Sequence, residues 1–295
     1  MTTPSDVRST TDALSGLLTE RRVVDLSLPL DETFPCTWPG HMPYRATVWT
    51  WFTARPDDPQ PVHPFNGGDY QTRWLVIDEH TGTHLDAPRH FVPPPDSQLE
   101  HAGPAGRVGI ADLPVLVASG PAAVIDADLP GAQVEPGHSP AITPGHIHQW
   151  ESDHGRLEGE VVLFRTGWDR HYQPFPAGSA YGSDVLTAGR RPGWPAPTPE
   201  TIGLLRQRAV TCVGTDGLSV GPAENGAPTH LAGLPHGVVY VEALTGLHRL
   251  PARGAWFLFL PIKLVGGTGG PGRAIAILPE TPGQETGVTD RSVQP

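Results

Sequence analysis

Cysteine is scarce in this 295-residue sequence, which contains only Cys36 and Cys212. Two cysteines cannot form a disulfide framework, so we expect a reducing, cytoplasmic compartment. No apolar run approaches the ~20 residues that cross a bilayer, and the N-terminus shows no signal-peptide pattern, so no membrane association is expected. Lys and Arg number 20 against 31 Asp and Glu, and the net charge of −11 provides no basic stripe for nucleic acid.

Glycine and proline, by contrast, are abundant, with 35 of each and no collagen-like period. This composition indicates many turns and long loops, and it disfavours a helical bundle. Residues 1–20 are interpreted as an arm or short helix, and residues 280–295 as a disordered tail. No internal repeat or long linker divides residues 21–279, so we expect one α/β domain there.

Short β-forming segments alternate with two helical ones along this domain. Two Thr-Pro pairs predict helices that begin at Thr143–Pro144 and Thr198–Pro199, with Thr as cap and Pro in the first turn. Residues 51–70 and 172–197 have the composition of long loops. Strands are predicted over residues 22–28, 45–53, 70–77, 122–126, 160–165, 209–214, 238–241, 256–260 and 274–278.

The segment from His80 to His90 contains the strongest chemical signal. If the chain from Trp74 onward is extended, alternate side chains share a face, and His80, His84 and Asp86 then converge. Gly82 between them is predicted to leave space for a cation. Imidazole and carboxylate are ligands that suit Zn²⁺, Mn²⁺ or Fe²⁺. The segment therefore predicts a metal site.

A second set of ligands is expected, because one strand rarely encloses a metal alone. Glu242 follows an apolar strand, where an unpaired carboxylate is costly to bury and a metal would account for it. His230 and His236 precede that strand, and the residues alone leave them as equal candidates.

The motif His-x-Gly-Thr-His-x-Asp-x-Pro-x-His at residues 80–90 resembles that of the cyclase family, which includes bacterial kynurenine formamidase and isatin hydrolase. Further segments over most of the chain are similar: residues 25–27, 163–168, 213–219 and 269–274. The resemblance implies a mixed, partly barrel-like β core flanked by helices, of the swivelling β/β/α type. It also implies a homodimer or homotetramer, with loops of one subunit covering a neighbour's site.

The resemblance also implies roles for individual residues. His80, His84 and Asp86 would be metal ligands and His90 the catalytic histidine, while the family's later His-to-Glu spacing selects His230 and Glu242. Family members hold one metal ion or two bridged by the Asp. This sequence departs from the family at Gly221, where members often have Asp. It is also longer than the compact kynurenine formamidases around 51–70 and 172–197, which favours the longer, isatin-hydrolase-like branch or a member with another substrate.

The expected function is hydrolysis of a C–N amide bond, in a cyclic amide such as isatin or a lactam or in an N-formyl aromatic amine. A metal-activated water would attack the carbonyl, and His90 would accept its proton and return it to the leaving nitrogen. No Gly-x-Ser-x-Gly elbow or suitably flanked cysteine indicates covalent catalysis. Trp38, Phe65 and Trp74 are candidates for an aromatic wall around the substrate, with core packing as the alternative.

Two other functions fit parts of the pattern. His84, Asp86 and His230 match the two-His-one-carboxylate triad of iron oxygenases, although His80 and Glu242 would crowd the positions such enzymes keep open for oxygen. A non-catalytic metal- or ligand-binding protein would not need His90. The sequence retains His90, which favours an enzyme.

Overall fold

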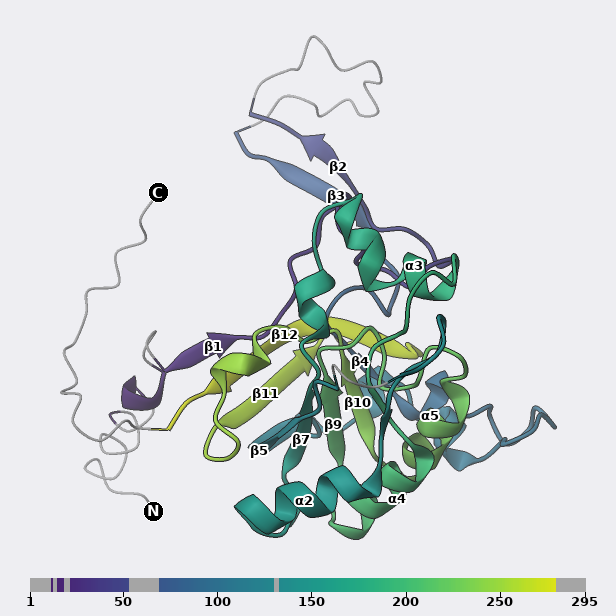
Figure 1. Ribbon diagram of the computed structural model, residues 1–295. Coiled ribbons are helices and arrows are strands. Elements are labelled where there is room, and N and C mark those ends of the chain that lie inside the picture. Colours follow the sequence, from purple (N-terminus) through teal and green to yellow (C-terminus); the bar gives the residue numbers. More distant parts are fainter. Residues whose placement is uncertain (1–11, 13–14, 19–21, 53–68, 130–132, 280–295) are drawn as a thin grey trace.

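A computed structural model describes residue 12 and residues 15–18, 22–52, 69–129 and 133–279 (Figure 1). The predicted arm at residues 1–20 lies largely outside these residues, and the tail at 280–295 and Phe65 lie wholly outside them. Within the described part of the chain, no helix combines the length and apolarity that a membrane crossing requires.

Four parallel strands form the centre of the domain: β5 (Ser119–Asp126), β7 (Val161–Arg165), β9 (Cys212–Thr215) and β10 (Val239–Glu242). Their residues are almost all buried, as the near-continuous apolar sequences of these strands predict. All four were predicted, with ends that differ by up to three residues.

Antiparallel strands close this sheet into a ring. Strand β10 pairs with β4 (His84–Asp86), β4 with β12 (Gly269–Ile277), β12 with β11 (Trp256–Pro261), and β11 with β5. Strand β1 (Val23–Asp25) adds to the outer edge of β12. The seven strands of the ring form the barrel-like core that the family resemblance implies, in a mixed α/β domain.

Alternate residues of each strand pack into two different cores. In β7, Val161 and Leu163 face a cluster inside the ring, whereas Val162 and Phe164 face a second cluster under the helices. In β4, Leu85 belongs to the inner cluster, so its neighbours on the strand point to the helix side. Because Leu85 is fixed in the inner cluster, the polar residues on either side of it, His84 and Asp86, lie on the face of the sheet that the helices cover.

Helices cover one side of the ring: α2 (Pro144–His154), α4 (Pro199–Gln207) and α5 (Ala227–Gly233) (Figure 1). The two Thr-Pro predictions are confirmed by α2 and α4, and Thr198 Oγ1 accepts from the N–H of Thr201. Helix α5 was not predicted, and neither was the short α3 (Ser183–Leu186). The predicted loop at 172–197 contains α3, a 3₁₀ turn and β8 (Ala196–Pro197), which pairs with β6 (Ala141–Ile142).

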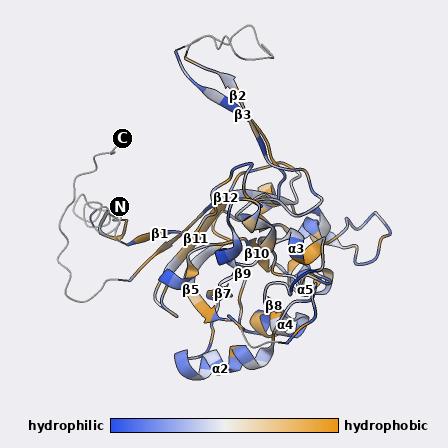
Figure 2. Cartoon of the chain, turned by 45° about the horizontal axis from the view of Figure 1, so that its top comes forward, coloured by the Kyte–Doolittle hydropathy of each residue, from blue (hydrophilic) through white to orange (hydrophobic). Residues whose placement is uncertain are grey.

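A two-stranded hairpin extends from the domain. It consists of β2 (Arg45–Thr50) and β3 (Thr72–Val76), and Figures 1 and 2 show it reaching away from the rest of the chain. Trp74 and Leu75 are exposed on it. Near its base, a third apolar cluster lies under the segments around residues 28–46 and 168–196.

Candidate metal centre

The register of β4 against β10 creates the base of the site. His84 lies directly opposite Glu242, and Asp86 opposite Tyr240. Because Leu85 points into the barrel, His84 and Asp86 project together toward the helices, beside the carboxylate of Glu242. His84 Nε2 lies 3.4 Å from Asp86 Oδ1 and 3.6 Å from Glu242 Oε2.

His80 does not belong to the same strand, which corrects the prediction of one extended stretch from Trp74 to Asp86. The chain turns between residues 78 and 83, and only His84–Asp86 is extended. Gly82 stands in this turn with φ +59°, and a Cβ there would lie 2.4 Å from Leu30 Cδ2. Glycine is therefore required by the turn and by the close approach of Leu30, and not by space for a cation.

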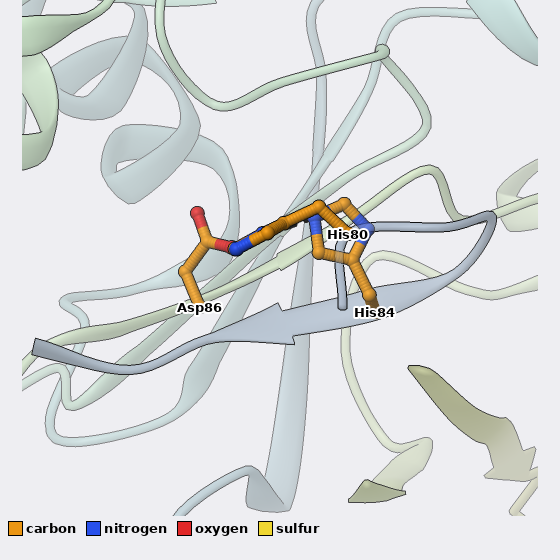
Figure 3. Close-up of side chains that lie close together, drawn as sticks. All are labelled: His80, His84 and Asp86. Carbon is orange, nitrogen blue, oxygen red and sulfur yellow. Dashed lines mark hydrogen bonds and ion pairs between the residues drawn. The ribbon is translucent and has the colours of Figure 1, made fainter. Parts of the chain in front are cut away.

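His80 nevertheless reaches the cluster from this turn. Its ring fills the space above Gly269, which lies opposite Asp86 on β12, and a Cβ at Gly269 would lie 2.6 Å from His80 Cε1. Figure 3 shows the His80 ring next to the Asp86 carboxylate. His80 Nδ1 lies 2.8 Å from Asp86 Oδ1. A small residue on a neighbouring strand thus admits the imidazole that the strand periodicity alone would not place.

His230 enters the site from helix α5, above the two strands. Its Nδ1–H donates to the carbonyl of Gly226 at 2.7 Å, and its Nε2 lies 3.3 Å from Glu242 Oε1 and 3.5 Å from Asp86 Oδ2. His236, the equal candidate from the residues alone, is exposed. The structure therefore brings His230 and not His236 to Glu242.

Glu242 is held by groups that the sequence analysis missed. Its Oε1 accepts hydrogen bonds from Ser219 Oγ at 2.8 Å and from the backbone N–H of Val220 at 2.7 Å. These two donors fix one carboxylate oxygen and leave Oε2 toward His84. Ser219 lies in a segment that was linked to the family, but no pattern in the sequence connected it to Glu242.

The charges of the site are strongly coupled. Burial opposes protonation of the imidazoles, but hydrogen bonding to Asp86 and the negative charges of Asp86 and Glu242 raise the pKa of His84 to about 9 and that of His230 to about 10. Burial opposes ionisation of Asp86 as well, yet the surrounding imidazoles hold the pKa of Asp86 well below its usual range. Two buried carboxylates thus require positive charge close by.

His90 lies beside these residues, but its pKa is shifted in the opposite direction from those of His84 and His230. Its ring stacks on His80, with centroids 4.0 Å apart, at the end of a 3₁₀ turn formed by Pro88–His90. Burial lowers the pKa of His90 to about 4, although the charge of Asp86 opposes the shift. The neutral ring has a nitrogen that can accept a proton.

The donor set fits a divalent metal ion. Two groups, His80–His84–Asp86 and Asp86–His230–Glu242, each offer ligand atoms within 4.8 Å of one another. Asp86 is shared by both groups. Its buried Oδ2 has no hydrogen bond of normal geometry in the described part of the chain, and His230 Nε2 lies 3.5 Å from it. A cation would satisfy this orphaned oxygen and neutralise the carboxylates, and imidazole with carboxylate suits Zn²⁺ and Mn²⁺.

Trp38 and Trp74, two of the predicted substrate-binding aromatic residues, lie in different parts of the molecule. Trp38 lines a cavity of about 360 Å³ together with Phe34, Tyr44 and Phe175, and packs edge-on against Trp194 with centroids 6.0 Å apart. Trp74 is 46% exposed on the projecting hairpin, and the structure does not bring it to the histidines. The proximity in sequence was misleading for Trp74, because the turn at 78–83 separates β3 from β4.

Comparison with known proteins places this chain in a family. Residues 24–222 match the cyclase family, described as "Putative cyclase". The isatin hydrolase of Roseibium aggregatum is 32% identical over 222 residues, which cover 73% of this chain and 78% of that protein. The kynurenine formamidase of Salinibacter ruber is 32% identical over 243 residues, covering 81% and 89%.

Solved structures agree with this result. Isatin hydrolase A from Labrenzia aggregata, bound to benzyl benzoate, is similar with a TM-score of 0.70 and 29% identity, covering 92% of this chain and 100% of that one. Isatin hydrolase A from Ralstonia solanacearum gives a TM-score of 0.71 and 26% identity, covering 94% and 99%. The structure is thus a mixed α/β barrel with a buried histidine–carboxylate cluster that is a candidate metal centre. The chain belongs to the cyclase family.

Proposed function

We propose that this protein is a metal-dependent hydrolase that cleaves a C–N amide bond. Its substrate would be a cyclic amide, such as isatin or a lactam, or an N-formyl aromatic amine. The observation that carries this proposal is the pair of buried ligand groups that share Asp86. The relatives named isatin hydrolase and kynurenine formamidase support the choice of substrates.

In this proposal, His80, His84, Asp86, His230 and Glu242 hold one or two Zn²⁺ or Mn²⁺ ions. When bound, a divalent cation polarises an amide carbonyl and makes water acidic enough to attack it near neutral pH. His84 and His230 each donate Nδ1–H to a backbone carbonyl, which leaves Nε2 free as a ligand.

His90 acts as the proton carrier in this proposal. It contacts the ligand His80 without belonging to either ligand group, so it can reach a molecule beside the metal. Its neutral ring accepts a proton from the attacking water and returns it to the nitrogen that leaves.

The aromatic part of the substrate is proposed to use the cavity that Trp38 lines. The cavity wall adjoins the turn that carries His80. Cys36 lines the cavity, and its carbonyl accepts a hydrogen bond from the N–H of Gly82 in that turn. Leu218, another lining residue, immediately precedes Ser219, which binds Glu242. A flat ring could thus contact Trp38 close to the ligands.

The proposal is tested by elemental analysis and a hydrolysis screen. Purified protein is assayed on N-formyl aromatic amines and cyclic amides before and after chelator treatment, and after readdition of Zn²⁺ or Mn²⁺. We expect activity that disappears with the chelator and returns with the metal. Equal turnover in anaerobic buffer would separate a hydrolase from an iron oxygenase, and chelator-insensitive turnover would contradict the proposal.

A homodimer or homotetramer is proposed as the functional assembly. The exposed Trp74 and Leu75 of the β2–β3 hairpin support this, since an isolated two-stranded hairpin is only marginally stable in water. Light scattering measures the assembly directly, and a monomer at micromolar concentration would contradict it. A cytoplasmic location stays a prediction from the sequence.

A further inference from the structure

A chain of hydrogen bonds connects His80 to a carboxylate outside the ligand groups. His80 Nε2 lies 3.0 Å from Thr268 Oγ1, and Thr268 Oγ1 lies 2.7 Å from Glu79 Oε2. The backbone N–H of Thr268 donates to the same Glu79 oxygen at 2.7 Å. Thr268 is therefore fixed at two points by Glu79.

The direction of the protons in this chain follows from elementary chemistry. A glutamate at neutral pH is ionised, so Glu79 Oε2 accepts and the single hydroxyl proton of Thr268 points toward it. The Thr268 oxygen then has only lone pairs to offer to His80. Consequently His80 Nε2 must carry the proton and donate to Thr268.

The other nitrogen of His80 then faces the site as an acceptor. In the neutral ring Nδ1 has a lone pair, and it lies 2.8 Å from Asp86 Oδ1, which is also an acceptor (Figure 3). Two acceptors at this distance repel each other unless a cation or proton lies between them. His84 and His230 are arranged in the opposite sense, because their Nδ1–H groups are bound to Gly82 and Gly226.

We propose that Glu79 and Thr268 are positioning residues that hold His80 in its Nε2–H tautomer, so that His80 binds the metal through Nδ1. His84 and His230 bind through Nε2. This inference rests on the proposed function, since it needs a metal ion at the site. It assigns residues 79 and 268 to the metal centre, although neither contacts a metal.

The loop that carries Thr268 is built to keep this contact. Arg89 donates to the carbonyl of Gly266 at 2.9 Å, and the N–H of Ile110 donates to Gly267 at 3.0 Å. The N–H of Ala87, next to the ligand Asp86, donates to the carbonyl of Thr268 at 2.9 Å. The hydroxyl is thus located relative to both His80 and Asp86.

Thr268→Val is the test, because it removes the hydroxyl and keeps the shape. Isothermal titration of the chelator-treated full chain with Zn²⁺ or Mn²⁺ is expected to show ~10- to 100-fold weaker binding, the usual loss when a group that orients a ligand is removed. Thr268→Ser should restore wild-type affinity. Thr245→Val is the matched control: its hydroxyl and the next N–H also donate to one carboxylate, Asp169, but touch no histidine.

A spectroscopic measurement reports the tautomer of His80 directly and does not rely on a metal affinity. Long-range ¹H–¹⁵N correlation spectra of ¹⁵N-histidine-labelled, Zn²⁺-loaded protein report which ring nitrogen is protonated. We expect one metal-bound histidine with Nε2–H, absent in His80→Gln, and others with Nδ1–H. A His80 signal with Nδ1–H, or unchanged metal affinity in Thr268→Val, would overturn the inference. Failure of the wild-type chain to bind either metal would instead overturn the proposed function.

Discussion

Gly221 provides a sharp prediction, because it packs against Gly226 at the start of α5 and against the ring of His230. A Cβ at this position would lie 2.5 Å from Gly226 Cα, 2.9 Å from Gly226 O and 2.8 Å from His230 Cε1. Two of these atoms are backbone, so they cannot give way as a flexible side chain would. The Gly226 carbonyl also orients the His230 ring. Gly221→Ala should therefore displace both the start of α5 and a proposed ligand.

Two quantities follow from this clash. Overpacking a close-packed site costs about 1–3 kcal/mol, so urea unfolding should give a correspondingly lower free energy of unfolding for Gly221→Ala. Metal affinity should fall about tenfold or more, as when a ligand loses its orienting partner. Gly221→Asp begins with the same Cβ and should be at least as damaging.

Gly203→Ala is the matched control for this substitution. Gly203 lies inside α4, and a Cβ there would meet nothing within 4 Å. Alanine in a helix interior should raise stability by roughly 0.5–1 kcal/mol and leave metal binding unchanged. The reasoning would be refuted if Gly221→Ala unfolded at the wild-type urea concentration and bound Zn²⁺ with wild-type affinity.

Three further predictions concern other parts of the molecule. His90→Ala should lower kcat by about 10²- to 10⁴-fold with unchanged metal content, and retained turnover would rule out its role in proton transfer. Trp38→Ala should raise KM for aromatic substrates more than it lowers kcat; a kcat effect alone would argue against the proposed substrate cavity. The hydrogen bond from Arg208 lowers the pKa of Glu151 to about 2 from 4.5, so this pair stabilises the fold above pH 4.5 and stops doing so as pH falls toward 2. Arg208→Leu should therefore lower the thermal unfolding midpoint at pH 7, and the difference should shrink steadily below pH 4.5; a constant difference would exclude the pair as its cause.

The central strands and two helices could be predicted from sequence because the signals are local. Apolar runs identify strands that are buried on both faces, and the Thr-Pro pairs mark helix starts at residues 143 and 198. Helix α5 was missed although Pro228 lies in its first turn, because its seven residues have no clear apolar periodicity. Only the family resemblance indicated a closed, barrel-like sheet. The pairing of β12 with β4 and β11 could not be predicted from local patterns, since pairing partners lie far apart in sequence.

The candidate site likewise combines residues that a local pattern predicts with residues that only the folded chain brings together. His84 and Asp86 alternate on a strand and could be placed from the sequence, whereas His80 reaches them only through a turn at Gly82 and the absence of a side chain at Gly269. Thr268 is 188 positions from His80 and lies beside it only in the folded chain. Residues that orient ligands by single hydrogen bonds have no characteristic sequence pattern.

Metal uptake by the wild-type chain and by Asp86→Asn tests the central claim most directly. After chelator treatment, both are titrated with Zn²⁺ and Mn²⁺, with Asp216→Asn as the control, because Asp216 is a buried carboxylate bonded to Thr166 and not to a histidine. We predict that the wild-type chain and Asp216→Asn take up one or two equivalents and that Asp86→Asn takes up none tightly. Absence of binding in the wild-type chain, or equal binding in Asp86→Asn, would contradict a metal centre built on the shared carboxylate.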